Sequence, residues 1–315
     1  MKIPDINTIR QAANRIHNII HHTPVMSSAN LNQMVDAEIF FKCENFQKVG
    51  AFKFRGATNA VLSLSEEDAD RGVATHSSGN HAAALTLAAK MRGVPAYIVM
   101  PKTSPQVKKD AVSGYGAKIT FCEPTLLSRE STLEEVVKKT GATFIHPYND
   151  YQIIAGQATA ALELLEEIPN LDIVMTPVGG GGLLSGTALS VFYLSPSTKV
   201  IAAEPEGADD AYRSIKEGKI IPSVNPKTIA DGLLTSLGDR TFPIIQKYVE
   251  QIVTVSDEAT IKSMRYIWER MKIIVEPSAA VPFGALLEKK IDLSGKRIGI
   301  ILSGGNVDLN NLPWL

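Results

Sequence analysis

A single lysine, Lys53, stands between two phenylalanines in the segment GAFKFRGA at residues 50–57. Aromatic neighbours exclude water from the Lys53 ammonium group, and the loss of hydration lowers its pKa. The neutral amine is a nucleophile that forms an imine with an aldehyde. Alternatively, Lys53 extends past Phe52 and Phe54 to water at the start of a helix. The chemical interpretation therefore requires a second site that holds an aldehyde cofactor.

Four consecutive glycines, Gly179, Gly180, Gly181 and Gly182, supply such a site in the segment TPVGGGGLLSGTA. They follow a predicted strand and precede a predicted helix, so backbone N–H groups and the positive end of that helix can bind an anion. The lysine and hydroxyl residue of a P-loop do not follow them. A tight turn is the alternative, but four glycines lose more chain entropy than a turn alone requires. The glycines therefore favour a monophosphate ligand.

A second loop contains Ser77, Ser78, Asn80 and His81 in the segment HSSGNHAAALTLAAK. It lies between a predicted strand and a predicted helix, where hydroxyls, an amide and free helix N–H groups can bind a carboxylate. A simple helix cap is the alternative for part of the cluster. Ser303 ends the apolar segment RIGIILS, at the edge where parallel sheets bind their ligands.

Two acidic residues, Glu204 and Asp210, lie in the segment AAEPEGADDAY. Their carboxylates are hard oxygen ligands of the kind that bind Mg²⁺ or Ca²⁺. Acidic residues are also common in the first turn of a helix, here one that begins near Ala208. The residues by themselves favour the helix interpretation over the metal site.

Short β-branched segments alternate with helical periodicity, which predicts an α/β fold with largely parallel sheets that are covered on both faces. The predicted strands span residues 38–44, 72–77, 96–100, 118–122, 143–147, 172–178, 199–205 and 297–303. Because 315 residues exceed what one core usually supports, we expect two domains. The small domain would comprise residues 72–147, and the large domain residues 1–71 and 148–315.

Composition narrows the class of partner. The net charge of −1 arises from 32 basic and 33 acidic residues that are mixed along the chain, so neither nucleic acid nor an anionic membrane is an expected partner. Two cysteines, Cys43 and Cys122, are too few for a disulfide framework and predict a reducing, cytoplasmic compartment. The expected ligand is a small molecule.

Five motifs together resemble a known family. The segments GAFKFRGA, HSSGNHAAA, VGGGGLLSG, AAEPEGADD and SGGNVD, in this order, are similar to the serine racemase and threonine dehydratase family of fold type II pyridoxal phosphate enzymes. The resemblance implies two doubly wound, open twisted sheets in a large and a small domain, with the cofactor between the domains. It also implies a homodimer.

The resemblance assigns roles around the cofactor. Lys53 would hold pyridoxal 5′-phosphate as an imine, Phe52 would pack on its ring, and Asn80 would hydrogen-bond its 3-hydroxyl. The glycines Gly179–Gly182 would bind its phosphate. Ser303 would face the pyridine nitrogen.

The implied reactions are racemisation of L-serine to D-serine and α,β-elimination of L-serine to pyruvate and ammonia, with L-threonine as a further substrate. Lys53 would be the catalytic base on one face of the amino acid. Ser78 would act as acid or base on the opposite face. Ser77, Ser78, Asn80 and His81 would also bind the substrate.

Related activities stay open. A threo-3-hydroxyaspartate dehydratase, which yields oxaloacetate, looks alike at Ser78, and a catabolic threonine dehydratase shares the other motifs. Asp231, in the loop TIADGLLTSLG, would orient a hydroxyl or a water, and a helix cap is its alternative role. Ala51 replaces the serine that most members carry before the Phe-Lys pair. A β-replacement enzyme and a non-catalytic carrier are further alternatives.

The resemblance reverses the interpretation of the acidic segment. Serine racemases hold a divalent cation through the positions that match Glu204, the carbonyl of Ala208, and Asp210. Mg²⁺, or Ca²⁺ or Mn²⁺ in its place, is therefore expected as a structural or activating ion.

Overall fold

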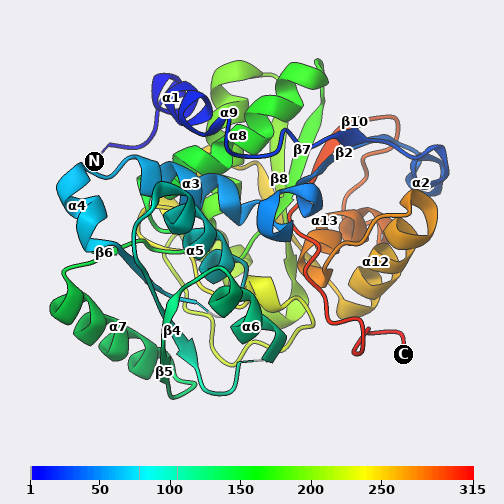
Figure 1. Ribbon diagram of the computed structural model, residues 1–315. Coiled ribbons are helices and arrows are strands. Elements are labelled where there is room, and N and C mark those ends of the chain that lie inside the picture. Colours follow the sequence, from blue (N-terminus) through cyan, green and yellow to red (C-terminus); the bar gives the residue numbers. More distant parts are fainter. Residues whose placement is uncertain (1, 78, 105) are drawn as a thin grey trace.

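Two sheets organise the computed structural model, which describes residues 2–77, 79–104 and 106–315 (Figure 1). A six-stranded sheet has the order β1-β2-β10-β7-β8-β9, and a four-stranded sheet has the order β5-β4-β3-β6. Every neighbouring pair is parallel except β1 and β2, which are antiparallel. This architecture confirms the predicted α/β fold class.

The strands are β1 (Val25–Met26), β2 (Glu38–Cys43), β3 (Val73–His76), β4 (Ala96–Pro101), β5 (Lys118–Cys122), β6 (Thr143–Phe144), β7 (Ile173–Pro177), β8 (Lys199–Pro205), β9 (Gln251–Val255) and β10 (Arg297–Leu302). The α-helices are α1 (Ile6–Ile16), α2 (Ala29–Val35), α3 (Lys53–Leu62), α4 (Glu66–Arg71), α5 (Asn80–Arg92), α6 (Gln106–Gly114), α7 (Leu126–Thr140), α8 (Tyr151–Glu167), α9 (Gly182–Leu194), α10 (Asp210–Glu217), α11 (Phe242–Tyr248), α12 (Asp257–Met271) and α13 (Pro277–Leu287). Short 3₁₀ helices include η1 (Glu44–Phe46), η3 (Glu206–Ala208) and η4 (Asp231–Leu233). Within the described parts of the chain, no helix is both long and apolar enough to cross a membrane.

The large sheet is buried on both faces. In its central strand β7, Ile173 and Met175 pack with α12 and α13, whereas Val174 packs with α8 and α9 on the opposite face. Side chains of a strand alternate between the two faces, so a strand with a core on each side is apolar throughout. The edge strand β9 is missing from the predicted strands, although Ile252, Val253 and Val255 have the β-branched character of a strand.

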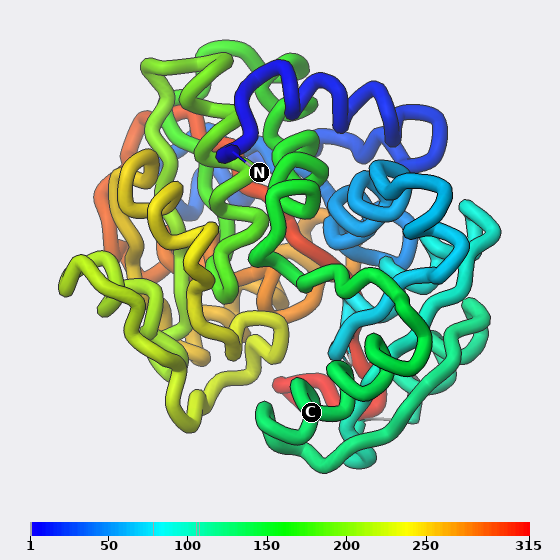
Figure 2. Tube along the Cα trace, turned by 90° about the vertical axis from the view of Figure 1, so that its left-hand side faces the viewer, coloured from blue at the N-terminus to red at the C-terminus, as the bar shows by residue number. Residues whose placement is uncertain are grey.

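The small sheet has its own cores. Val73 and Ile98 pack with α3 and α5, and Val99 packs with Leu133 of α7 on the other face. The segment that carries this sheet gathers on one side of the molecule (Figure 2). Helix α3 contacts both α5 and α8. The expected domain boundaries at residues 72 and 147 stay a prediction, and α3 is the element that joins the two halves.

Helices α3 and α8 meet at a pair of glycines. A Cβ atom on Gly156 of α8 would lie 2.6 Å from the Cα atom of Gly56 in α3. Real Cβ atoms do not approach this closely, so glycine is required for the two backbones to come together. This close crossing brings the side chains of α3 within reach of the polar side chains of α8.

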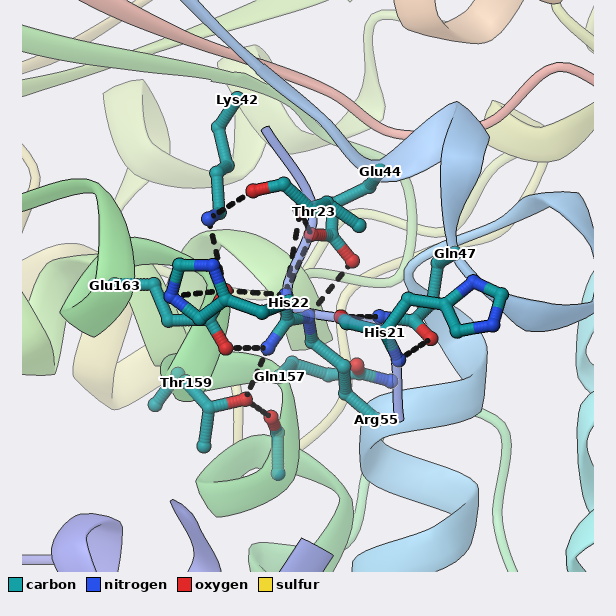
Figure 3. Close-up of polar contacts among 12 residues, drawn as sticks. His21, His22, Thr23, Lys42, Glu44, Gln47, Arg55, Gln157, Thr159 and Glu163 are labelled. Carbon is teal, nitrogen blue, oxygen red and sulfur yellow. Dashed lines mark hydrogen bonds and ion pairs between the residues drawn. The ribbon is translucent and has the colours of Figure 1, made fainter. Parts of the chain in front are cut away.

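A buried ion network anchors α3 at that crossing. The Arg55 guanidinium donates hydrogen bonds to Glu44 at 2.8 and 2.8 Å and to Glu163 of α8 at 2.6 and 2.7 Å (Figure 3). Arg55 and Glu44 are fully buried. Planar guanidinium and carboxylate groups match in a forked geometry that fixes orientation as well as distance. The network therefore sets the position of the first turn of α3.

Lys42 extends the same network. Its Nζ atom lies 2.8 Å from Glu163 and 3.0 Å from Glu167, and His22 approaches these two carboxylates at 3.9 and 3.6 Å. Burial alone would raise the pKa of Glu163, but hydrogen bonds and charges from Arg55 and Lys42 outweigh burial and lower it. Because these cations already compensate the carboxylates, the cluster is an ion-pair network and not a metal site.

We expect the substitution Arg55→Met to be strongly destabilising, because it leaves the Glu44 carboxylate buried without its cation. The expected loss is about 3–5 kcal/mol of unfolding free energy, measured by urea denaturation followed by circular dichroism. Arg71→Met is the control, because it breaks a pair with the exposed Glu67 and should leave the unfolding free energy nearly unchanged. Equal losses in the two variants would contradict the role given to the network.

Candidate active site

Lys53 begins α3 at the edge of the large sheet where β10 ends. The N–H of Phe52 donates a hydrogen bond to the Ser303 carbonyl at 3.0 Å, and the N–H of Gly305 donates to the Gly50 carbonyl at 2.9 Å. The loop before Lys53 and the loop after β10 are thus joined by their backbones. Phe52 and Lys53 are thus brought next to Ser303, the third predicted cofactor residue of this region. This is expected for ligand groups at the carboxyl ends of parallel strands.

The Lys53 amine lies in a largely dry environment. It donates a hydrogen bond to the Pro147 carbonyl at 2.8 Å and lies 5.2 Å from the centre of the Phe52 ring. Burial lowers the pKa of Lys53 to about 8, although the charge of Glu276 acts in the opposite direction. A substantial share of the amine is therefore neutral at mildly alkaline pH and can act as a nucleophile or a base.

The four glycines form a loop between β7 and α9. Gly181 has a φ of +86°, a left-handed conformation that favours glycine. A Cβ atom would lie 2.9 Å from the Leu233 Cα atom if placed on Gly179, and 2.4 Å from the Tyr148 ring if placed on Gly180. The loop opens α9 at Gly182, where N–H groups of the first helical turn are available to an anion. These residues fit a phosphate group.

Asn80 is the first residue of α5, and its side chain faces the N-terminal end of α13. The Nδ2 atom lies 3.1 Å from both carboxylate oxygens of Glu276, and Oδ1 accepts a hydrogen bond from Asn306 Nδ2 at 2.9 Å. The Ser77 N–H donates to the Val99 carbonyl at 3.2 Å, which continues the pairing of β3 with β4. Ser78, the predicted acid or base of the second face, lies outside the described residues.

The His81 ring is engaged inside the protein. It is buried, and its Nε2 atom lies 3.2 Å from the Ile145 carbonyl. Burial, reinforced by the positive charge of Lys53, holds the pKa of His81 well below its usual value. The ring is therefore neutral, and it donates from Nε2 to that carbonyl. What His81 can offer a carboxylate is the N–H of the first turn of α5.

Asp231 is exposed and is held by an ion pair. Its carboxylate lies 2.6 Å from Lys108 Nζ of α6. Both residues line a cavity of about 700 Å³ together with Gly79 and Asn80. Among the described residues that line this cavity, Lys53 does not occur. The structure thus brings Asp231 to Asn80 across the cavity, with its carboxylate bound to the small-sheet helix α6.

Sequence reasoning missed Pro147 and Glu276, which act on the Lys53 amine, and Tyr148, which lies against Gly180 of the glycine loop. Pro147 ends the predicted strand at 143–147 and Tyr148 directly follows it, the same position that pointed to the other loops. Glu276 follows the apolar run IIV and precedes Pro277, and no spacing rule links it to Lys53. Burial raises the pKa of Glu276 to about 7.

The acidic segment forms a separate buried site. Both oxygens of Glu204 accept backbone N–H groups at the start of α10, from Ala211 and Tyr212 at 2.8 Å each. Asp210 is also buried, and neither of its oxygens has a hydrogen-bond partner among the described residues. Burial raises the pKa of Glu204 to about 8 and that of Asp210 to about 6. Two buried carboxylates, next to the end of η3 at Ala208, fit a divalent cation.

Comparison with known proteins identifies relatives along the whole chain. A family model described as "Pyridoxal-phosphate dependent enzyme" matches residues 16–304. The chain is 52% identical to the beta-hydroxyaspartate dehydratase of Paracoccus denitrificans, over 100% of both chains. It is 49% identical to the serine racemase of Dictyostelium discoideum, over 98% of this chain and 96% of that one. The structure of maize serine racemase superposes with a TM-score of 0.96 at 46% identity, over 98% of this chain and 95% of the other.

We expect the reactivity of Lys53 to follow its lowered pKa. In the cofactor-free protein, acetylation of Lys53 by a limiting amount of acetic anhydride should rise with a midpoint near pH 8, since only the neutral amine reacts. Mass spectrometry of peptides measures the extent of Lys53 acetylation at each pH. A lysine model compound, with an ordinary pKa of about 10.4, is the reference. The assignment of a dry environment is wrong if the two midpoints coincide.

Proposed function

The chain belongs to the pyridoxal-phosphate-dependent enzymes, and from that premise we propose that it racemises L-serine to D-serine and eliminates water from L-serine to give pyruvate and ammonia. L-Threonine is a further substrate of the elimination. The observation that carries the proposal is the Lys53 amine, whose pKa is lowered to about 8. This lysine occurs in a chain that is 49% identical to a serine racemase.

A second candidate is an ammonia-lyase for threo-3-hydroxyaspartate, which would release oxaloacetate and ammonia. It is favoured by the 52% identity to a beta-hydroxyaspartate dehydratase across the full length of both proteins. The two candidates share the cofactor, the base and the bond that breaks first. They differ in whether the substrate carries a second carboxylate.

The cofactor would be held by residues that surround Lys53. Lys53 would carry pyridoxal 5′-phosphate on its amine, with Phe52 against the ring and Asn80 at the 3-oxygen. The loop Gly179–Gly182 would bind the phosphate, and Ser303 would face the pyridine nitrogen. When bound, the cofactor supplies an electron sink that stabilises negative charge at the substrate α-carbon.

Proton transfer then depends on the residues of the chain. The Lys53 amine would take the α-proton from one face, because burial keeps a share of this amine neutral and therefore able to accept a proton. Return of a proton from Ser78 on the opposite face gives the other enantiomer. Departure of the β-hydroxyl instead, protonated to water, gives the keto acid and ammonia after hydrolysis.

Substrate binding would use the start of α5. Ser77, Ser78, Asn80 and His81 would bind the α-carboxylate, with His81 contributing its backbone N–H, since its ring is occupied by the Ile145 carbonyl. Asp231 would orient a hydroxyl or a water through the carboxylate oxygen that is not bound to Lys108. The amino-acid substrate is the small-molecule partner.

A divalent cation is proposed at the second buried site. Glu204, the Ala208 carbonyl and Asp210 would bind Mg²⁺, or Ca²⁺ or Mn²⁺ in its place. Support comes from the two Asp210 oxygens, which lack partners among the described residues. The ion would stabilise the fold around α10.

The proposed state of the protein is a cytoplasmic homodimer with a small domain at residues 72–147. Cys43 and Cys122 are free and buried, which suits a reducing compartment. The small sheet spans Val73–Phe144 and contacts the large sheet through α3 and the loops around Asn80. Closure of this domain over the substrate would exclude water from the amine.

A proton NMR time course in D₂O tests the proposed function. Protein with pyridoxal 5′-phosphate and Mg²⁺ is mixed separately with L-serine, L-threonine and both threo-3-hydroxyaspartate enantiomers. Loss of the α-proton signal with the amino acid intact, followed by chiral analysis, reports racemisation. Pyruvate, 2-oxobutyrate or oxaloacetate reports elimination, and the fastest substrate decides between the two candidates.

Variants assign the residues in the same assay. Lys53→Ala should abolish α-proton exchange with every substrate, whereas Lys90→Ala, at an exposed site in α5, should retain it. Ser78→Ala should lose D-serine formation and keep elimination, because only reprotonation uses the second face. Exchange that persists in Lys53→Ala would rule out Lys53 as the base.

The cation site is tested by thermal unfolding. Addition of millimolar Mg²⁺ or Ca²⁺ should raise Tm, since a ligand that binds only the folded state stabilises it. Asp210→Asn should lose this shift. Asp209→Asn is the matched control, because Asp209 is paired with Arg213 at the surface and should keep the shift. The proposed cation site is wrong if the ion raises the Tm of Asp210→Asn as much as it raises that of the wild type.

A further inference from the structure

Glu276 precedes α13 but does not use its side chain to cap that helix. The residue is only 5% exposed. Its carboxylate turns instead toward Asn80, whose Nδ2 atom lies 3.1 Å from each oxygen, and accepts the Asn306 N–H at 3.2 Å. A buried carboxylate thus lies directly behind Asn80.

The side chain of Asn80 is held at both ends. Its Oδ1 atom accepts a hydrogen bond from Asn306 Nδ2 at 2.9 Å, and the same Asn306 amide donates to the Val49 carbonyl at 2.7 Å. An ionised carboxylate only accepts hydrogen bonds, so Glu276 can face Nδ2 of Asn80 but not Oδ1. One N–H of Nδ2 can be shared between the two carboxylate oxygens, which leaves the other N–H for a ligand.

Glu276 has little room to move. Its own N–H donates to the Gly304 carbonyl at 3.0 Å, and a Cβ atom on Gly304 would lie 2.8 Å from Glu276 Oε1. The loop that contains Gly304 is joined to Gly50 by the N–H of Gly305. The carboxylate is therefore fixed on the same backbone frame as the start of α3.

The charged groups that face Glu276 come from three elements: Lys53 of α3, Asp231 of η4 and Lys108 of α6. Burial raises the pKa of Glu276 to about 7, and Asp231 adds to the rise, while the hydrogen bond from Asn80 and the charge of Lys108 act against it. Ionisation of this carboxylate thus occurs within about a unit of the pH at which Lys53 becomes neutral.

We propose that Glu276 is a positioning residue that holds the Asn80 amide with one N–H directed at the 3-oxygen of the bound cofactor. The inference rests on the proposed function, from which it takes the role of Asn80. Glu276 acts through Asn80 and contributes no atom to the reaction. Protonation of Glu276 relaxes the constraint, because a carboxylic acid also donates and Asn80 can then present Oδ1 to it.

The substitution Glu276→Gln tests the proposal, since it keeps the shape of the side chain and removes the acceptor-only character. Titration of cofactor-free protein with pyridoxal 5′-phosphate, followed by absorbance at pH 8, should give a Kd about tenfold higher than in the wild type. Glu288→Gln, at the other end of α13, is the matched control and should leave Kd unchanged. Tm of each cofactor-free variant verifies that it is folded.

A double-mutant cycle separates positioning from a direct effect on Lys53. In an Asn80→Ala background, Glu276→Gln should change Kd by less than about twofold, because the residue through which it acts is gone. A tenfold effect that persists in that background overturns the proposal, as does an unchanged Kd in the single variant. A wild-type protein that binds no pyridoxal 5′-phosphate would instead refute the proposed function, and the inference with it.

Nuclear magnetic resonance of the cofactor-free wild type gives a readout that does not depend on whether the Glu276 variant folds. The Asn80 side-chain amide signal, assigned by its loss in Asn80→Ala, should shift with a midpoint near pH 7 as Glu276 ionises. The shift should be absent in Glu276→Gln if that variant folds. A wild-type signal that stays constant from about pH 6 to pH 8.5 overturns the proposal.

Discussion

The hydrogen bonds between the Arg55 guanidinium and the carboxylates of Glu44 and Glu163 hold the frame on which the candidate active site is built. Loss of the Arg55 guanidinium from this position would leave the Glu44 carboxylate buried without its cation, so α3 cannot shift against β2 or α8 without a large loss of stability. Lys53 lies two positions before Arg55 on the same helix. The structural ion network therefore also fixes the position of Lys53, which carries the reactive amine.

Burial then tunes the groups around that amine in opposite directions. It lowers the pKa of Lys53 to about 8 and that of His146 to about 4, and it raises the pKa of Glu276 to about 7. The low-dielectric environment disfavours every charged form, whether cation or anion. The result is a site in which a substantial share of neutral amine and a neutral imidazole coexist at mildly alkaline pH, the condition that a lysine base requires.

The chain is almost equally similar in sequence to a serine racemase and to a beta-hydroxyaspartate dehydratase, at 49% and 52% identity. This is understandable because both reactions begin with the same proton transfer and need the same cofactor frame. The ion pair between Lys108 and Asp231 joins α6, which follows a strand of the small sheet, to η4 on the large-sheet side.

Much of this protein could be predicted from its sequence, because strands, helices and loop chemistry are local properties. The α/β class, the glycine loop and the position of Lys53 at the start of a helix all follow from patterns within a few residues. The loops group at one edge because parallel strands share a direction. The short strand β1, with two residues, carries no such pattern.

The partners of those residues were decided only by the tertiary structure. The Pro147 carbonyl reaches Lys53, Glu163 reaches Arg55, and Glu276 reaches Asn80 across long stretches of chain, and no local spacing connects them. Burial is likewise a property of the packed molecule, and it is burial that lowers the pKa of Lys53 and raises that of Glu276. The sequence determined which chemical groups stand at the ends of the strands. The packing of α3 between the two sheets decided which of them meet and in what protonation state.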